Sequence, residues 1–76
     1  MSKFWMQVAS APDRANVFVE LWLGDVLVAE VIQERGAKEI VLHASEGAGA
    51  MDLAAFTEAL GRAAAVPLVR ELPSTT

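Results

Sequence analysis

A glycine–aspartate pair between two apolar runs constrains this chain more than any other feature. Gly24 and Asp25 separate residues 16–23 from residues 26–33, and both runs are rich in β-branched, aromatic and other apolar residues. A two-residue loop with glycine first is typical of a type II′ turn, which joins neighbouring antiparallel strands. The sequence therefore predicts a β-hairpin that pairs outward from this turn, beginning with Leu23 opposite Val26.

Two further strands are expected on either side of the hairpin. Residues 3–9 form a first strand, which ends where Pro12 and Asp13 supply a turn. Residues 38–44 form a fourth strand after the turn at 34–37. Because every connection is short, neighbouring strands are expected to pair antiparallel.

The second half of the chain is rich in alanine and predicts one helix, from residue 53 to about residue 65. Asp52 is a good N-cap because its carboxylate accepts hydrogen bonds from free backbone amides, and Pro67 ends the helix. The apolar stripe is expected to consist of Leu53, Phe56, Leu60 and Ala64. Residues 66–72 are compatible with a short last strand.

These elements predict an α+β fold. Three or four strands form an antiparallel β-meander, one helix packs on one face, and a short C-terminal strand is an option. The chain has 76 residues, 54% of them hydrophobic, which suits one packed domain. That domain is expected to span residues 1–72, with a disordered tail at 73–76.

Composition removes several ways of stabilising so small a domain. The chain has no cysteine and one histidine, His43, so neither a disulfide nor a zinc site is expected. No other cofactor is expected. Self-association is the remaining common way for so small a domain to compensate for its small hydrophobic core.

Charge and hydropathy limit the cellular location and the kinds of partner that can be expected for this protein. The net charge is −4, and the six Lys and Arg residues are scattered along the chain, so direct binding to nucleic acid is not expected. An acidic mimic of nucleic acid is the alternative, although such mimics carry denser runs of carboxylates. No apolar run reaches about 18 residues, and the N-terminal run is too short for a secretory signal, so we expect a cytoplasmic protein without a membrane span.

The hairpin register divides the sheet into two faces. If Gln33 also pairs with Lys38, one face holds Phe18, Trp22, Leu27, Ala29, Val31, Ile40 and Leu42. The other face holds Val17, Val19, Leu21, Leu23, Val26, Val28, Ile32 and Val41, with Glu30, Glu39 and His43 near its margin.

Both faces are apolar, and a single helix covers only one of them. The aromatic face is expected under the helix, because Phe18 and Trp22 supply bulk for Phe56. The seven aliphatic residues from Val17 to Ile32 are then a predicted protein interface, most simply of a homodimer formed sheet on sheet. Two alternatives stay open: the first strand or the C-terminal segment folds across this face, or the register is shifted by one residue.

One residue conflicts with this assignment. Glu20 falls between Phe18 and Trp22 on the face assigned to the core. Either Glu20 lies at an edge of the sheet, or the two faces are assigned the wrong way round.

No catalytic constellation is recognisable, so the protein is not expected to be an enzyme. His43 and Ser45 are the only pair that resembles a base and a nucleophile, and no orienting acid accompanies them at a recognisable position. The stretch Gly47–Gly49 has too few glycines for a phosphate-binding loop and lacks the Gly-Lys-Ser/Thr ending. Its expected role is a flexible connection.

The small size, the acidic net charge and the lack of a recognisable catalytic constellation together favour a non-enzymatic inhibitor or regulator that binds another protein. An anti-CRISPR-type inhibitor from a phage or mobile element, docking on a bacterial protein complex, is the first expectation. The alternatives are an immunity or antitoxin protein and a self-assembling structural or accessory subunit. A small-ligand binder would need a pocket between helix and sheet lined by Trp22, Phe56 and Met51.

Overall fold

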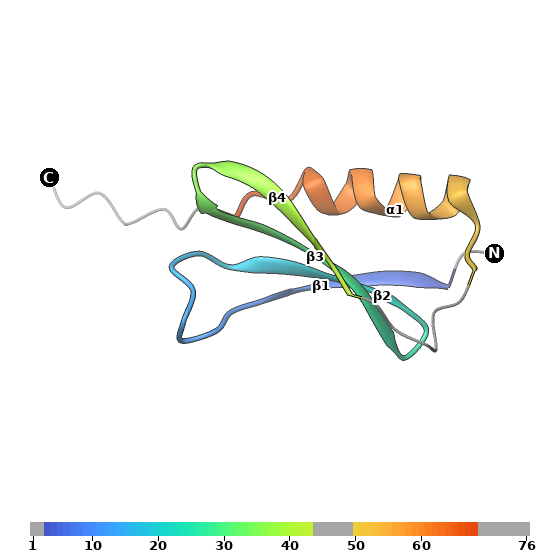
Figure 1. Ribbon diagram of the computed structural model, residues 1–76, viewed down its shortest axis with the longest axis horizontal. Coiled ribbons are helices and arrows are strands. Elements are labelled where there is room, and N and C mark those ends of the chain that lie inside the picture. The colour runs from blue at the N-terminus through green and yellow to red at the C-terminus, as the bar shows by residue number, and fades with distance from the viewer. Residues whose placement is uncertain (1–2, 44–49, 69–76) are drawn as a thin grey trace, which may run out of the picture.

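A four-stranded antiparallel sheet with one helix on one of its faces makes up the protein in the computed structural model, which describes residues 3–43 and 50–68 (Figure 1). The elements are β1 (Phe4–Ala9), β2 (Phe18–Leu23), β3 (Val26–Arg35), β4 (Ala37–Leu42) and α1 (Leu53–Ala64). The strands lie in the order β1-β2-β3-β4, so the predicted α+β meander is confirmed. Residues 66–68 form no strand, and the rest of the predicted last strand and the tail lie outside the described residues.

The β2–β3 turn has the predicted chemistry. Gly24 has a φ of 61°, whereas Asp25 is not among the residues with positive φ. A type II′ turn requires this combination. Leu23 pairs with Val26 and Trp22 pairs with Leu27, so the register beside the turn is confirmed.

A β-bulge then shifts the pairing by one residue. Leu21 lies opposite Ala29 instead of Val28, and Glu20 consequently lies opposite Glu30. The extra residue is Val28, which has no partner on β2. Beyond the bulge the predicted β2–β3 register is therefore wrong by one residue, whereas the predicted β3–β4 alignment holds from Ala29 to Ile32.

The helix begins and ends close to the predicted positions. The Asp52 side chain caps it by accepting a hydrogen bond of 2.8 Å from the backbone amide of Ala55. At the other end the ammonium group of Lys38, on β4, donates to the carbonyl oxygens of Ala64 and Val66. A cation at this end also complements the helix dipole.

The stripe that α1 buries differs from the predicted one. Ala59 and Ala63 are buried, and Phe56 and Leu60 pack beside them. Leu53, by contrast, is 76% exposed. Small side chains at the contact let the helix axis approach the sheet closely, which larger residues would prevent.

The face that α1 covers is the aliphatic one, so the predicted assignment of the two faces is wrong. Six of the seven predicted interface residues pack in the two core clusters with α1 or the segment after it, namely Val17, Val19, Leu21, Leu23, Val26 and Val28. Only Ile32 lies on the opposite face, because its neighbour Val31 points into the core. These six side chains are therefore covered and do not form the open interface expected from the sequence.

Charge explains which face the helix covers. Glu20 and Glu30 lie on the aromatic face, where a packed helix would enclose two carboxylates. Removing a charge from water costs several kcal/mol unless the charge is paired. Over the paired stretches 19–23 and 26–31, the aliphatic face presents no charged side chain. The conflict noted for Glu20 is thereby resolved by reversing the faces.

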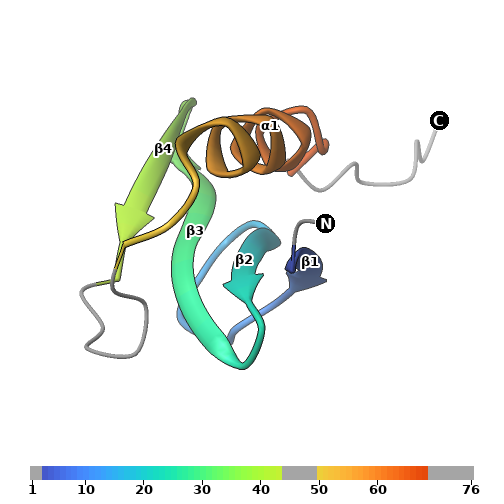
Figure 2. The ribbon, with the colours of Figure 1, turned by 90° about the vertical axis from the view of Figure 1, so that its right-hand side faces the viewer.

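The sheet is twisted and curves around the helix, as the end-on view in Figure 2 shows. The helix lies nearest to β1 and β2. As a result β4, at the far edge of the sheet, keeps two exposed apolar residues on the helix side, Ile40 and Leu42.

Candidate protein-binding face

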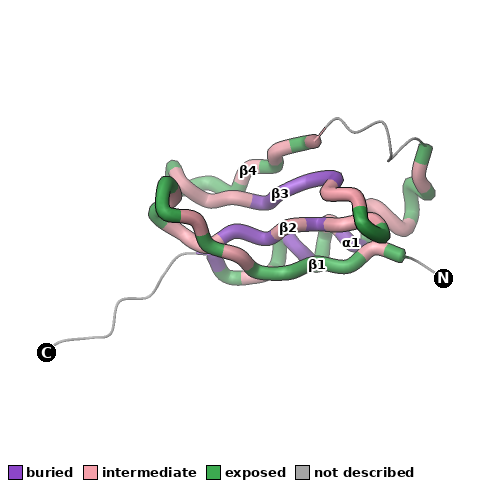
Figure 3. Tube along the Cα trace, turned by 90° about the horizontal axis from the view of Figure 1, so that it is seen from below, coloured by how far each residue is buried: buried purple, intermediate pink, exposed green. Residues whose placement is uncertain are grey.

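We call the sheet face turned away from α1 the open face. It is seen from below in Figure 3, where the buried stretches follow β2 and β3, between β1 and β4. The alternation of the strands gives it Trp5, Gln7, Phe18, Glu20, Trp22, Leu27, Glu30, Ile32, Glu39 and Val41. The open face therefore combines aromatic, aliphatic and acidic side chains.

Two stacked tryptophans occupy the β1 side of the open face. Trp5 and Trp22 are direct cross-strand partners, with ring centroids 5.3 Å apart and planes 11° from parallel. The Trp5 indole is held in place because its Nε1 donates a hydrogen bond of 2.7 Å to the carbonyl oxygen of Gly24. Trp5 remains 44% exposed, so an aromatic surface is presented to solvent.

Glu20 lies beside this stack. Its Oε1 accepts a hydrogen bond from the Gln7 side-chain amide and one of 3.4 Å from Trp22 Nε1. Within residues 3–43 and 50–68, no Lys, Arg or His forms an ion pair with Glu20. The carboxylate is thus oriented by two neutral donors, and its negative charge is left unbalanced.

Glu30, directly opposite Glu20 on β3, instead forms an ion pair with Arg14 and also contacts His43. It is only 7% exposed. Its Oε1 lies 3.3 Å from Arg14 Nη2 and 3.1 Å from His43 Nε2. Two carboxylates at directly opposite positions repel each other, and the Arg14 guanidinium offsets that repulsion.

The loop between β1 and β2 brings Arg14 to this position. The guanidinium carbon lies 4.3 Å from the centroid of the Phe18 ring, a cation–π contact that covers the ring. Phe18 is buried as a result. The loop therefore closes one end of the open face and leaves the tryptophan end free.

Glu34 anchors the same loop. Its carboxylate accepts hydrogen bonds from the backbone amides of Ala15, at 2.8 Å, and Asn16, at 3.0 Å. These two donors, with a smaller contribution from the charge of Arg14, hold the pKa of Glu34 below its ordinary value. The Asn16 side chain adds a hydrogen bond to the carbonyl oxygen of Gln33.

The predicted functional residues are not brought together. The predicted interface is mostly core, as described above. His43 contacts Glu30, while Ser45 and Gly47–Gly49 lie outside the described residues. The predicted ligand pocket is wrong, because Trp22 lies on the open face and Phe56 and Met51 pack on the other side of the sheet.

Neither a metal-binding cluster nor a membrane-spanning helix occurs in the described part of the chain. No three His, Asp or Glu side chains among residues 3–43 and 50–68 gather closely enough to hold a metal ion. Over the same residues, no helix has both the length and the apolarity needed to cross a membrane.

Comparison with protein-family models, with curated proteins and with solved structures finds no match to this chain.

Sequence reasoning missed the contributions of Trp5 and Arg14. Trp5 becomes part of the site only because β1 pairs in register with β2. Arg14 reaches Glu30 through a loop whose path no local pattern specifies. The usable signal was Glu20 between Phe18 and Trp22, since a carboxylate between two aromatic residues on a strand marks a face that is not fully buried.

Proposed function

We propose that this protein is a non-catalytic binding protein that docks on a basic surface of another protein through the tryptophan end of the open face. The observation that carries the proposal is the juxtaposition of the Trp5–Trp22 stack and the unbalanced carboxylate of Glu20. A partner arginine or lysine would lie against an indole ring and pair with this carboxylate. Apolar neighbours of the partner cation would meet Leu27 and Val41.

Physical chemistry favours a cation at this position. Tryptophan gives the strongest cation–π attraction among the aromatic side chains, about 0.5–1 kcal/mol at an exposed site. Tryptophan is also enriched among the residues that dominate binding energy at interfaces. The net charge of −4 attracts a basic partner at long range and accelerates encounter.

Intrinsic fluorescence tests the proposal directly, because Trp5 and Trp22 are the only tryptophans in the chain. A short arginine-rich peptide should change the tryptophan emission in a saturable way, and added salt should weaken the effect. An acidic peptide of the same length should have no effect. Glu20→Gln should weaken binding of the arginine-rich peptide several-fold.

A matched control separates this site from the general effect of net charge. Glu58→Gln removes the same charge from an exposed position on α1, on the other side of the sheet, and should leave binding almost unchanged. Equal losses in the two variants would mean that only net charge attracts the peptide, and the proposed site would be abandoned.

The narrower role of an anti-CRISPR-type inhibitor uses the same mode of binding. It predicts that co-expression with a bacterial defence complex restores the survival of a targeted plasmid, and that Glu20→Gln reduces this protection. An immunity or antitoxin role predicts instead that the chain neutralises a co-expressed toxin. Survival assays distinguish the two, because each uses a different challenge.

A further inference from the structure

The β4 edge of the sheet has no neighbouring strand among the described residues, and α1 does not cover it. The strand order ends at β4, and the helix lies nearest to β1 and β2. Ile40 is 44% exposed and Leu42 is 69% exposed, both on the helix side of the sheet. An edge strand with exposed apolar side chains is a template for another strand.

The hydrogen bonds to β3 determine which main-chain groups of β4 point outward. The amide of His43 donates to the carbonyl oxygen of Val28, at 3.0 Å, so Leu42 and Ala29 are a non-hydrogen-bonded pair. Bonding alternates along an antiparallel ladder, which directs the amides and carbonyls of Glu39 and Val41 toward β3. The amides and carbonyls of Lys38, Ile40 and Leu42 therefore point away from the sheet.

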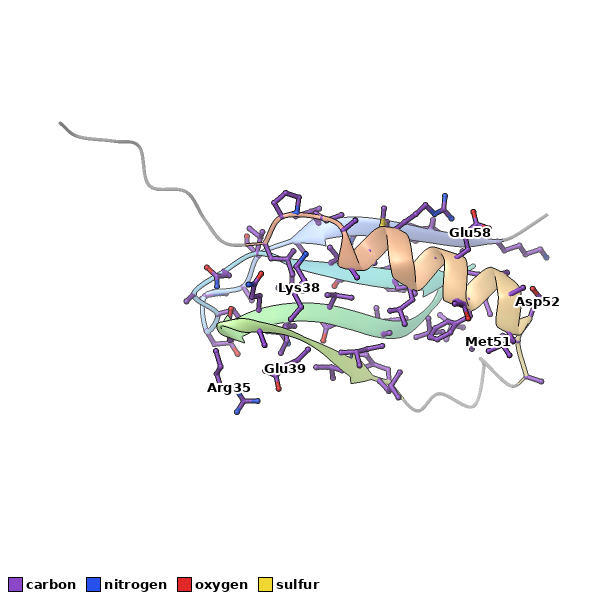
Figure 4. All side chains as sticks on the ribbon, turned by 90° about the horizontal axis from the view of Figure 1, so that it is seen from above. Arg35, Lys38, Glu39, Met51, Asp52 and Glu58 are labelled. Carbon is purple, nitrogen blue, oxygen red and sulfur yellow. The ribbon has the colours of Figure 1, made fainter. Side chains whose placement is uncertain are left out.

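The two charged side chains of β4 are held by contacts within the chain. Lys38 donates to the carbonyl oxygens of Ala64 and Val66 at the C-terminal end of α1, and Figure 4 shows it directed from β4 toward the helix. Glu39 pairs with Arg35 at 2.8 Å. A lysine on an edge strand ordinarily deters strand addition, but this ammonium group is turned away from the edge.

We infer that the partner of this edge is a second copy of the same chain. In this arrangement β4 pairs with β4 of the second copy in antiparallel orientation, about a two-fold axis at Val41. The two four-stranded sheets then form one continuous sheet of eight strands. This arrangement differs from the face-to-face dimer expected from the sequence.

Complementarity of charge and hydropathy selects this register. On the helix side, Ile40 lies opposite Leu42 of the second copy, and the two-fold axis repeats this pair. On the open face, Glu39 lies opposite His43 of the second copy, and this pair is repeated in the same way. Val41 meets its own symmetry mate. His43 Nε2 faces Glu30, so only a protonated ring would have a second N–H, on Nδ1, to donate to the carboxylate of the second copy.

A two-fold axis at Ile40 is the nearest competing register, and it is less favourable. It would place Lys38 opposite Leu42 and Glu39 opposite Val41, so each charged group would face an aliphatic one. Burying a charge against an apolar partner is costly. Complementary pairs arise only when the axis passes through Val41.

The opposite edge, β1, offers a weaker case. Val8 and Met6 are exposed there, but α1 lies over β1. The strand carries no charged residue, so no charge pair would set its register. The β1 edge nevertheless supplies the matched control for the experiment.

Molar mass in solution is the first test. Light scattering should give twice 8.1 kDa, falling toward 8.1 kDa on dilution. Leu42→Lys should raise the dissociation constant of the dimer about tenfold or more, because two added cations approach each other beside the axis. Leu53→Lys adds the same charge at another exposed leucine and should leave the dimer intact.

Disulfide trapping tests the register, because the natural chain has no cysteine. The Cα atoms of Val41 and its symmetry mate are expected about 4.5 Å apart, close enough for a disulfide. Mild oxidation of Val41→Cys should therefore give a covalent dimer. A mixture of Glu39→Cys and His43→Cys should cross-link, whereas each variant alone should not.

Met6→Cys on β1 is the control and should stay monomeric on a non-reducing gel. Three results would each overturn the inference: a monomer at millimolar concentration, a Leu42→Lys protein whose dimer dissociation constant is unchanged, or faster cross-linking at position 6 than at position 41. Circular dichroism of each variant confirms that a loss of dimer is not a loss of fold.

Discussion

Glu20 and Glu30 lie directly opposite each other on neighbouring strands, yet within residues 3–43 and 50–68 only Glu30 forms an ion pair with an arginine. Arg14 and His43 both contact the Glu30 carboxylate, whereas Glu20 is held by the neutral donors Gln7 and Trp22. One carboxylate therefore stabilises the loop before β2, and the other is left to attract a cation from outside.

Removing Arg14 should destabilise the fold through Glu30. Arg14→Met leaves an almost buried carboxylate opposite Glu20, and the free energy of unfolding should fall by about 2 kcal/mol. Glu30→Gln in the same chain should recover part of that loss, because no unpaired charge then remains. Urea denaturation of the two single variants and the double variant measures the coupling; strict additivity would show that the ion pair contributes nothing.

Glu34 should make stability depend on pH in the acidic range. Its pKa is lowered in the folded state by the amides of Ala15 and Asn16, so the folded state binds fewer protons than the unfolded state. The stabilisation is fully present above the ordinary glutamate pKa of about 4.3 and is lost as the pH falls through the lowered value.

Glu34→Gln removes this titration. The difference in unfolding free energy between the natural chain and Glu34→Gln should be constant from about pH 6 to pH 8 and shrink below about pH 4. Thermal denaturation across this range measures it. A difference that grows on acidification would contradict the assigned role of the two amides.

Leu21 and Leu53 should respond very differently to the same substitution. Leu21 is 1% exposed in the core beneath α1, whereas Leu53 is 76% exposed. Leu21→Ala should cost about 3 kcal/mol, a large share of the stability of so small a domain. Leu53→Ala should change stability by less than about 0.5 kcal/mol, and a large loss there would mean that Leu53 is covered in solution.

Two glycine-to-alanine substitutions should have opposite signs. Gly24 has a φ of 61° and open space around the position of a Cβ, so Gly24→Ala should cost about 1 kcal/mol through backbone conformation alone. Gly61 lies inside α1 with nothing within 4 Å of the place that a Cβ would take, and Gly61→Ala should stabilise the protein by about 0.5–1 kcal/mol. Chemical denaturation of both variants checks the signs.

Much of the local structure could be predicted from the sequence. The hairpin at Gly24, the cap at Asp52 and the boundaries of the helix follow from turn and capping chemistry, which acts between residues close in the chain. The candidate site was not predicted, because its residues come from three separate segments. Trp5 meets Trp22 only after β1 pairs with β2, and Arg14 reaches Glu30 only after the loop folds back.

The face of the sheet that the helix covers could not be predicted from the sequence pattern. Both faces of the β2–β3 hairpin are apolar, so alternation divides the residues into two sets but does not say which set the helix covers. The bulge at Val28 then moves Ala29 and Val31 to the same side as Leu21. A single extra residue of this kind leaves no distinctive mark in a run of valine, leucine and alanine.

The sequence by itself determined an antiparallel meander, its central turn and one capped helix, because these depend on interactions between neighbours in the chain. Only the tertiary structure decided which face is core and which is open. Ala59 and Ala63 let the helix approach the aliphatic face closely, and the carboxylates of Glu20 and Glu30 oppose burial of the aromatic one. Both effects arise between segments far apart in sequence, where close packing and the cost of removing charge from water decide the arrangement.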